Sequence, residues 1–225
     1  MGYKYQMHTH TFPASDCGAM EPEELAHALY IGGYSGCVLT NHFYWGNTGI
    51  GRNMPWEKFV SLFTDDYYRA VEAAKEWDID IIFGLEEHIG SGLEILCYGI
   101  TPEILLAHPE LCEMGVERWH SVMGSCGGLC IQAHPFRSVW YIDSPGLLDK
   151  KYIDGFEVYN ACNCEEDNNS ALSAFGENLD MIVVSGADAH TTAMLCIGGI
   201  ETEQRIRTGK ELVGVLRSGK YKILK

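Results

Sequence analysis

The stretch Val184-Ser-Gly-Ala-Asp188-Ala-His190 joins an apolar segment to two residue types that bind metals. The apolar segment begins at Met181 and is typical of a buried strand. Residues two apart on an extended chain point to the same side, so we expect Asp188 and His190 to leave this strand together. Near the other end of the chain, His8-Thr-His10 repeats the spacing with two imidazoles. The two pairs predict a metal site around which the fold closes.

Length and charge limit the classes of protein to consider. The 225 residues suit one α/β domain that spans the whole chain, 1–225. The formal net charge of −15 argues against nucleic acid or anionic membranes as partners, because surfaces that bind them are basic. It does not exclude a phosphate ester, because bound divalent cations can be the largest local charges in a site.

The sequence contains no apolar run near the roughly 20 residues that cross a bilayer. Its first residues lead directly into His8, so we expect no signal peptide. The nine cysteines include no C-x-x-C pair, which disfavours a structural zinc finger. We interpret them as free, largely buried thiols and expect a cytoplasmic protein. The oligomeric state is left open.

Apolar runs and helical spacing alternate along the chain. The runs predict strands at 3–10, 36–40, 79–83, 93–98, 128–132, 155–159, 181–185 and 221–224. The spacing predicts helices at 21–29, 56–77, 102–106, 109–125, 168–178 and 211–219. The aromatic stripe of 56–77, which includes Phe59 and Phe63, is interpreted as core. This alternation predicts a parallel sheet, open or closed into a barrel.

Ionisable residues follow the predicted strands. They are His8 and His10, His42, Glu86, His134, and Asp188 with His190. Parallel α/β folds bring the carboxyl ends of their strands to one face, where active sites form. A single histidine at a strand end is more typically a surface residue, or a core residue whose hydrogen bonds are satisfied. Five of nine histidines at strand ends predict a metal centre.

The ligand types indicate the metals and the chemistry. Imidazole with carboxylate suits Zn²⁺, Mn²⁺ or Fe²⁺. One ion takes three or four protein ligands, so this set predicts two or three ions. In such a centre a bridging water loses its proton near neutral pH and attacks, while the cations hold the substrate oxygens. Phosphoester hydrolysis is the reaction class that this arrangement serves best.

Six short motifs resemble those of the PHP (polymerase and histidinol phosphatase) family. In order they are His8-Thr-His10, Ser15-Asp16, Thr40-Asn41-His42, Gly84-Leu-Glu86, Ala133-His134-Pro135 and Asp188-Ala-His190. The resemblance covers residues 5 to about 200. It implies a distorted (β/α)7 TIM-like barrel and a metal-dependent phosphoesterase with a metal-bound hydroxide as nucleophile. The implied metal ligands are His8, His10, Asp16, His42, Glu86, His134, Asp188 and His190.

Roles within that set follow from the same resemblance. Glu86 is a plausible bridge between two ions, and Asp188, His190 and His134 are expected to act in catalysis. The chain departs from many relatives after the Gly-x-Glu motif, where Glu94 stands near the place of a further histidine. Glu94 is then an oxygen ligand, or the third metal is weak or absent. Other candidates are His88, His108 and His120, while His27 is expected at the surface.

Polar and aromatic residues near the motifs have two interpretations each. Arg137 follows the Ala-His-Pro motif and either grips a substrate phosphate or forms a structural ion pair. Arg52 is a weaker candidate for phosphate. Glu157 and Asn160 are expected to orient metal ligands rather than bind metal. The aromatic residues 43–45 and 56 either line the cleft or cap the barrel.

Three functions remain for comparison. The leading hypothesis is a metal-dependent hydrolase of a small phosphate monoester or of a phosphorylated protein side chain. A phosphodiesterase or nuclease is the second, although the sequence offers no basic track for a nucleic-acid backbone. The third is a metal-holding regulatory module without turnover, which the intact His-x-His and Asp-x-His pairs disfavour.

Overall fold

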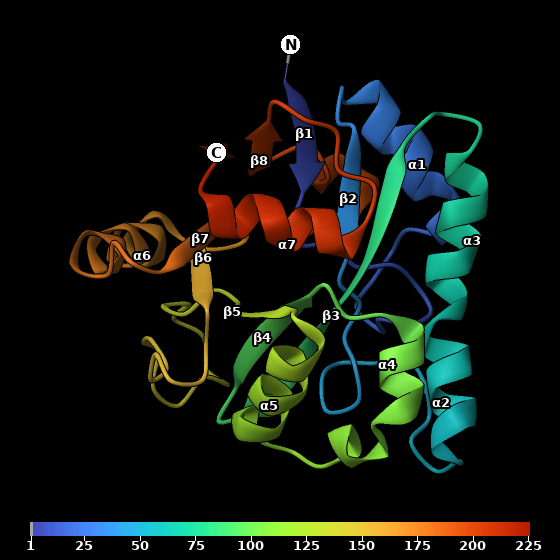
Figure 1. Cartoon of the computed structure of the whole chain (residues 1–225), viewed down its shortest axis with the longest axis horizontal. Helices are drawn as coiled ribbons and strands as arrows, with labels where there is room; N and C mark the ends of the chain where they lie inside the picture. Colours follow the sequence, from blue (N-terminus) through green and yellow to red (C-terminus); the bar gives the residue numbers. More distant parts are fainter. Residues whose placement is uncertain (1) are drawn as a thin grey trace.

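Nine strands form one sheet that curls into a nearly closed barrel (Figure 1). A computed structural model describes residues 2–225. The strands are β1 (Tyr3–Gln6), β2 (Gly36–Leu39), β3 (Asp80–Gly90), β4 (Leu93–Tyr98), β5 (Leu129–Gln132), β6 (Gly155–Asn160), β7 (Ile182–Gly186), β8 (Gly199–Thr202) and β9 (Tyr221–Leu224). Their order across the sheet is β7-β6-β5-β4-β3-β2-β1-β8-β9. The expected distorted, TIM-like α/β barrel is confirmed.

The barrel closes where the segments after β1 and β7 meet. Thr9 forms a parallel bridge with Ala189. The His10 N–H donates to the Ala189 carbonyl at 2.8 Å, and the Ala189 N–H donates to the His8 carbonyl at 3.1 Å. These backbone bonds place the His-x-His pair beside the Asp-x-His pair at one rim.

The sheet is mixed, so the expectation of a parallel sheet is only partly correct. Strands β1, β2 and β3 are parallel, and so are β5, β6 and β7. Strand β4 is antiparallel to both of its neighbours because only two residues separate it from β3, too few for a crossover helix. Strand β8, which the sequence pattern did not predict, pairs antiparallel with β1 and β9.

Most predicted strands agree with the structure within a residue or two, but two differ in length. β1 ends at Gln6, so His8 and His10 follow the strand instead of lying within it. β3 runs on to Gly90, which places Glu86 in the middle of the strand and not at its end. The longer β3 forms a hairpin with β4, and this pairing carries Glu86 and Glu94 on neighbouring strands.

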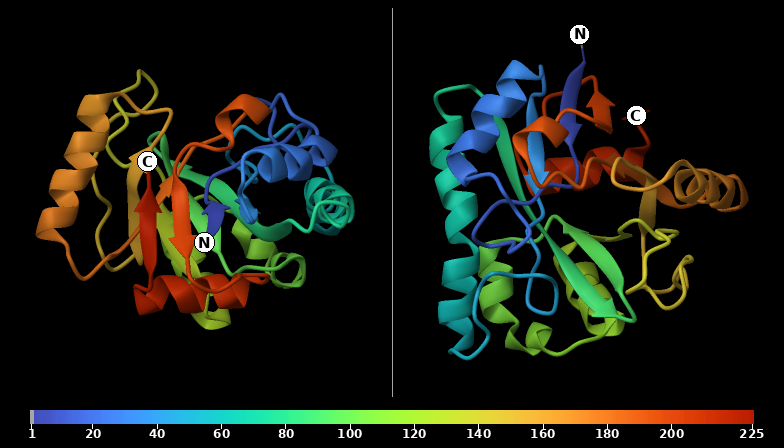
Figure 2. Two further views of the ribbon diagram at one scale, coloured as in Figure 1. Left: turned by 90° about the horizontal axis from the view of Figure 1, so that it is seen from above. Right: turned by 180° about the vertical axis from the view of Figure 1, so that it is seen from behind.

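The helices cover the outside of the barrel (Figure 2). They are α1 (Pro22–Ile31), α2 (Trp56–Phe63), α3 (Asp65–Ala74), α4 (Pro102–Ala107), α5 (Val116–Cys126), α6 (Glu165–Glu177) and α7 (Gly209–Ser218), with short 3₁₀ turns at Pro109–Cys112 and Thr192–Met194. The Arg217 guanidinium donates to the carbonyl of Gly128, just before β5, so α7 lies at the amino ends of the parallel strands. Leu212 and Leu216 of α7 join the core inside the barrel.

Two predicted helices are each divided in the structure. The helix expected over 56–77 is interrupted at Thr64, which lies between α2 and α3. The Val60 carbonyl accepts both the backbone N–H and the hydroxyl of Thr64, each at 2.9 Å, and side-chain bonds of this kind often bend helices. The helix expected over 109–125 becomes a 3₁₀ turn and α5. Between them Gly115 has φ +133°, a backbone conformation that favours glycine.

The aromatic stripe of α2 packs into the core, as expected. Phe43, which follows His42, is fully buried and meets Phe63 and Trp119 edge to face, with ring centroids 4.8 and 5.5 Å apart. Trp56 also packs on Phe43, whereas Trp45 is partly exposed. The aromatic residues around 43–56 therefore divide between core and surface.

The nine cysteines are all free, as expected. They are less buried than expected, because Cys17, Cys162 and Cys164 are exposed. Among residues 2–225, none of the helices has the length and apolar character needed to cross a membrane.

We expect Phe43→Ala to lower the free energy of unfolding by about 3–5 kcal/mol, because it leaves a cavity among close-packed rings. Urea unfolding at matched metal content measures the change. Leu172→Ala on α6 is the control, since Leu172 is exposed and surface changes usually cost about 0.5 kcal/mol or less. Equal stability of both variants would show that Phe43 is not a core anchor.

Candidate metal centre

Imidazole and carboxylate groups from both ends of the chain converge at the rim where the barrel closes. The group contains His8, His10, His42, Glu86, Glu94, His134, Asp188 and His190. Most of these side chains are buried, and only Glu94 and His190 are partly exposed. The structure thus brings together every predicted ligand except Asp16.

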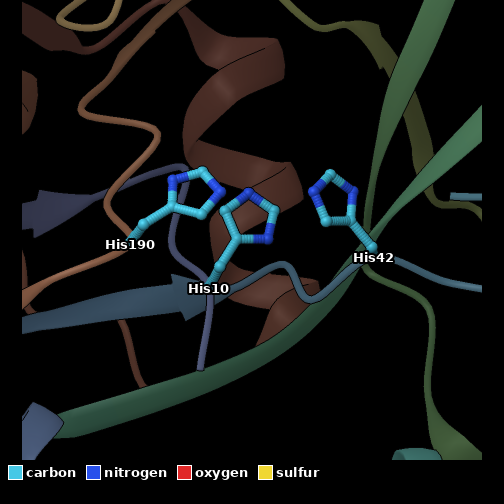
Figure 3. A group of neighbouring side chains, drawn as sticks. All are labelled: His10, His42 and His190. Carbon is cyan, nitrogen blue, oxygen red and sulfur yellow. The ribbon is translucent and has the colours of Figure 1, made fainter. Parts of the chain in front are cut away.

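Three sets within this group have ligand atoms close enough to share an ion. They are His10, His42 and His190; His8, His10 and Asp188; and His42, Glu86 and Glu94. Figure 3 shows the imidazole of His10 between those of His42 and His190. Its ring centroid lies 4.4 and 4.5 Å from theirs. The sets share members, which is the arrangement of a multinuclear centre.

The distances between ligand atoms agree with coordination of a common ion. Ligand atoms that each lie about 2.1 Å from one ion are roughly 3 to 3.5 Å apart. His10 Nε2 lies 3.2 Å from Asp188 Oδ1 and 3.4 Å from Glu86 Oε2. His8 Nε2 lies 3.5 Å from the same Asp188 oxygen. Glu94 is as close, with Oε2 3.3 Å from His134 Nε2.

Within residues 2–225, several of these buried atoms have no hydrogen-bond partner. They are His8 Nε2, His10 Nε2, His42 Nδ1 and Glu86 Oε2. Leaving a buried polar atom unpaired costs about 1–3 kcal/mol, and such atoms are rare in folded proteins. Divalent cations would satisfy all four at once, so the residues fit a metal centre.

Neighbouring side chains orient His8 and His134. Glu157 Oε1 lies 3.0 Å from His8 Nδ1 and accepts its proton, which leaves the lone pair of Nε2 facing the centre. The other oxygen of Glu157 accepts the backbone N–H of His134 and the side-chain amide of Asn160, both at 2.9 Å. These contacts agree with the expected orienting role of Glu157 and Asn160.

Ser15 orients His10 in a similar way. Its hydroxyl donates to Asn41 Oδ1 at 3.0 Å and accepts the backbone N–H of His42 at 2.9 Å. The hydroxyl proton is thus committed, so His10 Nδ1, 3.2 Å away, carries a proton and donates. His190 Nδ1 likewise donates to the Asp188 carbonyl at 2.7 Å. Both histidines keep Nε2 free for a metal.

The electrostatics keep the carboxylates ionised. Burial alone would raise the pKa of Glu86. The neighbouring His8 and His42 outweigh this effect and hold the pKa well below its usual range. Burial also raises the pKa of Asp188, while His8, His10 and Arg137 bring it well below its usual range. Burial and the nearby His42 lower the pKa of His10 to about 3. Burial lowers the pKa of His8 and of His42, but Glu86 and the other nearby groups raise both well above their usual value. Imidazole binds a metal in its neutral form, so a cation would have to displace these protons.

Two residues of the centre have strained backbones. His134 has φ +28° and Asp188 has φ +55°, values that are uncommon outside glycine. Hydrogen bonds hold both in place, from the His134 N–H to Glu157 and from Arg137 to Asp188 Oδ2 at 2.7 Å. Strain of this kind persists where surrounding contacts over-determine the conformation, often at functional sites.

Arg137 forms an ion pair within the protein. Besides Asp188, its guanidinium donates to the side-chain oxygens of Asn160 and Asn163, both at 2.8 Å. Of the two interpretations of Arg137, phosphate binding or a structural ion pair, the structure shows the ion pair. Arg137 also borders the cavity over the centre. That cavity has a volume of about 470 Å³ and is bordered by Trp45 and Tyr141 beside the ligands.

The remaining candidates lie outside the three ligand sets. Asp16 is exposed and belongs to none of the three ligand sets, so its role as a ligand stays a prediction. His88 borders the cavity and accepts the Gly92 N–H at 3.1 Å. His108 pairs with Glu110 at the surface, and His27 packs on Trp77.

Sequence reasoning missed Cys17, whose sulfur lies 3.1 Å from His190 Nε2. Burial raises the pKa of its thiol, but interactions with His190 and His42 lower it to about 6. The sequence feature that could have indicated Cys17 is its position directly after the Ser15-Asp16 motif.

The sequence matches no protein-family profile and no curated protein. Its structure resembles solved structures at low identity. A two-domain protein from Bacteroides vulgatus, with a predicted PHP-like metal-dependent phosphoesterase, is 13% identical with a TM-score of 0.72, covering 99% of this chain and 64% of that one. PsfC from Pseudomonas syringae is 16% identical with a TM-score of 0.65, covering 100% and 92%.

A third similar structure is the lesion-specific endonuclease EndoQ from Pyrococcus furiosus, at 14% identity and a TM-score of 0.68. The match covers 99% of this chain and 58% of the endonuclease. At these identities the comparisons establish the fold alone. The chain therefore has the barrel fold of PHP-like metal-dependent phosphoesterases.

Proposed function

We propose that this chain is a metal-dependent hydrolase of phosphate esters, preferably monoesters. The observation that carries the proposal is the cluster of buried imidazoles and carboxylates in which four polar atoms lack hydrogen-bond partners. The centre would hold two or three ions of zinc, manganese or iron, because the ligands outnumber those that one ion takes. The similar fold of the B. vulgatus protein agrees with this assignment.

Glu86 is suited to bridge two of the ions. Its Oε1 lies 3.2 Å from both His8 Nε2 and His134 Nε2, and its Oε2 lies 3.0 Å from His42 Nδ1. The two oxygens therefore face different histidines. We propose His8, His10, His42, Glu86, His134, Asp188 and His190 as ligands, with Glu94 as a further oxygen ligand.

When bound, the cations would lower the pKa of water and stabilise negative charge on phosphoryl oxygens. The residues of the chain hold the ligands in place, with Glu157 and Ser15 setting which imidazole nitrogens are free. Asp188 and His134, both in strained conformations, are the proposed catalytic residues together with His190. Arg137 holds Asp188 and borders the cavity, and this position supports a second role for Arg137 in binding the substrate phosphate.

A small phosphorylated substrate fits the cavity best. Its volume of about 470 Å³ lies within the range of roughly 300–1,000 Å³ that is usual for small-molecule sites. Arg52 is occupied by the carbonyls of Tyr44 and Gly46, so the loop beside the cavity offers no free cation there. We propose a cytoplasmic enzyme because its thiols are free.

Phosphodiester or nuclease activity is the alternative, supported by the structural likeness to the P. furiosus endonuclease. The net charge of −15 weighs against it, because a nucleic-acid backbone requires a basic track. A non-catalytic metal-binding module is the other alternative.

Removal of metal by a chelator should abolish hydrolysis of a chromogenic phosphomonoester and lower the thermal unfolding temperature. Reloading with Mn²⁺ or Zn²⁺ should restore both. Ligand at 100 times its Kd stabilises a protein by about 2.7 kcal/mol. Elemental analysis of the purified protein should give two or three ions per chain. Fewer than one ion per chain would count against the metal centre.

His134→Ala should lower phosphomonoester hydrolysis by at least about 100-fold while the protein stays folded. Loss of an outer-sphere partner of a metal already costs about 10–100-fold, and loss of a ligand should cost no less. His108→Ala, at a partly exposed histidine that pairs with Glu110, is the matched control and should keep full activity. Comparable rates for both variants would exclude this site, and faster cleavage of a phosphodiester by the wild type would favour the alternative.

Glu157→Gln should weaken metal affinity about 10–100-fold, because a neutral amide no longer fixes the proton on His8 Nδ1. A competition titration against a chromogenic chelator measures the affinity. Glu177→Gln on the exposed face of α6 provides a control of the same chemistry. If both variants bind metal like the wild type, Glu157 does not orient the ligands.

A further inference from the structure

We infer that the thiolate of Cys17 completes the metal position formed by His10, His42 and His190, in the place where the motif pattern predicts Asp16. The inference rests on the proposed metal centre and adds a ligand of a different kind to it. Four facts support it: the position of the sulfur, the loop that sets it, an unpartnered imidazole atom at the three-histidine set, and the presence of Cys17 but not Asp16 in the lining of the cavity over the centre.

The sulfur lies at the open side of the three-histidine set. Cys17 Sγ is 3.1 Å from His190 Nε2. His190 Nδ1 is occupied by the Asp188 carbonyl, so the lone pair of Nε2 is directed toward the sulfur side. A thiolate sulfur about 2.3 Å and a nitrogen about 2.1 Å from one zinc ion would lie roughly 3 to 3.6 Å apart.

A tight loop places Cys17 at the border of the cavity over the centre. The Gly18 N–H donates to the Ser15 carbonyl at 3.1 Å, and the Asp16 N–H donates to the Asn47 carbonyl at 2.9 Å. A Cβ on Gly18 would lie 2.8 Å from the carbonyl carbon of Thr11, so the turn has room only for glycine there.

The same loop is attached to the segment that carries His190. The Ala19 N–H donates to the His190 carbonyl at 2.8 Å. This bond keeps the thiol beside the imidazole, and it connects backbone to backbone, independent of any side-chain rotamer. Cys17 and Asp16 are both exposed, and both lie outside the three ligand sets. They differ in that Cys17 borders the cavity over the centre and contacts His190, whereas Asp16 is not among the residues that line this cavity.

Independent evidence for a ligand at this position comes from the histidines themselves. His10 is fully buried, and its Nε2 has no hydrogen-bond partner. The unpartnered Nδ1 of His42 lies 3.0 Å from Glu86 Oε2 and belongs to the Glu86 side of the centre. The ring of His10 lies between the other two (Figure 3), so an ion at this position would be reached by imidazoles and by the sulfur of Cys17.

A thiolate ligand changes which metal the position prefers. Soft sulfur ligands select Zn²⁺ or Fe²⁺ over Mn²⁺, which prefers carboxylate and water. The ion bound by Cys17 is therefore zinc or iron(II), while the positions built from imidazole and carboxylate accept manganese. The two kinds of position should exchange metals differently.

The test is titration of the chelator-stripped, reduced, full-length protein with Co²⁺ under anaerobic conditions. Co²⁺ bound to a thiolate gives a charge-transfer absorption band in the near ultraviolet, which nitrogen and oxygen ligands do not give. Wild type, Asp16→Asn and the control Cys164→Ser should show the band. Cys17→Ser should lack it, still bind Co²⁺ at the remaining positions, and hold one ion at least about tenfold more weakly.

A second measurement needs no variant. Zn²⁺ should protect Cys17 of the wild type from alkylation by iodoacetamide, while exposed Cys164 keeps its rate. Peptide mass spectrometry follows both sites. This alkylation measurement tests whether Cys17 binds the metal even if Cys17→Ser does not fold.

The outcomes separate this inference from the proposed function. Co²⁺ binding without the band, or a band that survives in Cys17→Ser, would overturn the role of Cys17 and leave the metal centre intact. Loss of one ion in Asp16→Asn alone would assign the ligand to Asp16. Absence of Co²⁺ binding by the wild type would overturn both the ligand and the proposed function.

Discussion

Two backbone hydrogen bonds between the segments after β1 and β7 hold the functional face of this barrel together. The bonds join His8 and His10 to Ala189, residues about 180 positions apart in the chain. They set the His-x-His pair and the Asp-x-His pair side by side, so that His10 Nε2 and Asp188 Oδ1 lie 3.2 Å apart. Without this closure the remaining ligands, on β3 and after β2 and β5, would surround only half of a centre.

Burying these imidazole and carboxylate groups so close together is unfavourable, and bound cations would offset that free-energy cost. Imidazole nitrogens and carboxylate oxygens are buried with atoms that lack hydrogen-bond partners. His134 and Asp188 have strained backbones as well. Surrounding bonds from Glu157, Ser15 and Arg137 hold this arrangement. Because a preformed metal site rarely exists in an unfolded chain, the free energy of metal binding contributes to folding.

The sequence predicted the residues of the centre more completely than it predicted the architecture of the sheet and helices. The sequence pattern identified most residues of the centre, since His8, His42 and His134 each stand next to a recognisable apolar run. It also found most strands and helices. It did not find β8, whose four residues Gly-Ile-Glu-Thr lack a distinctive alternation, or the break at Thr64. The antiparallel setting of β4 was missed because the preceding strand was predicted to end at residue 83, which hid the two-residue turn between β3 and β4.

The sequence by itself determined which ligand types occur, in what order, and that most of them follow strands of an α/β fold. These are local properties, set by apolar runs and by the two-residue period of an extended chain. Only the tertiary structure decided which side chains meet. It extended β3 so that Glu86 and Glu94 face the same histidines, paired Arg137 with Asp188, and brought the sulfur of Cys17 to 3.1 Å from His190 Nε2. Those contacts depend on register, loop geometry and the hydrogen bonds between distant segments, which no local pattern encodes.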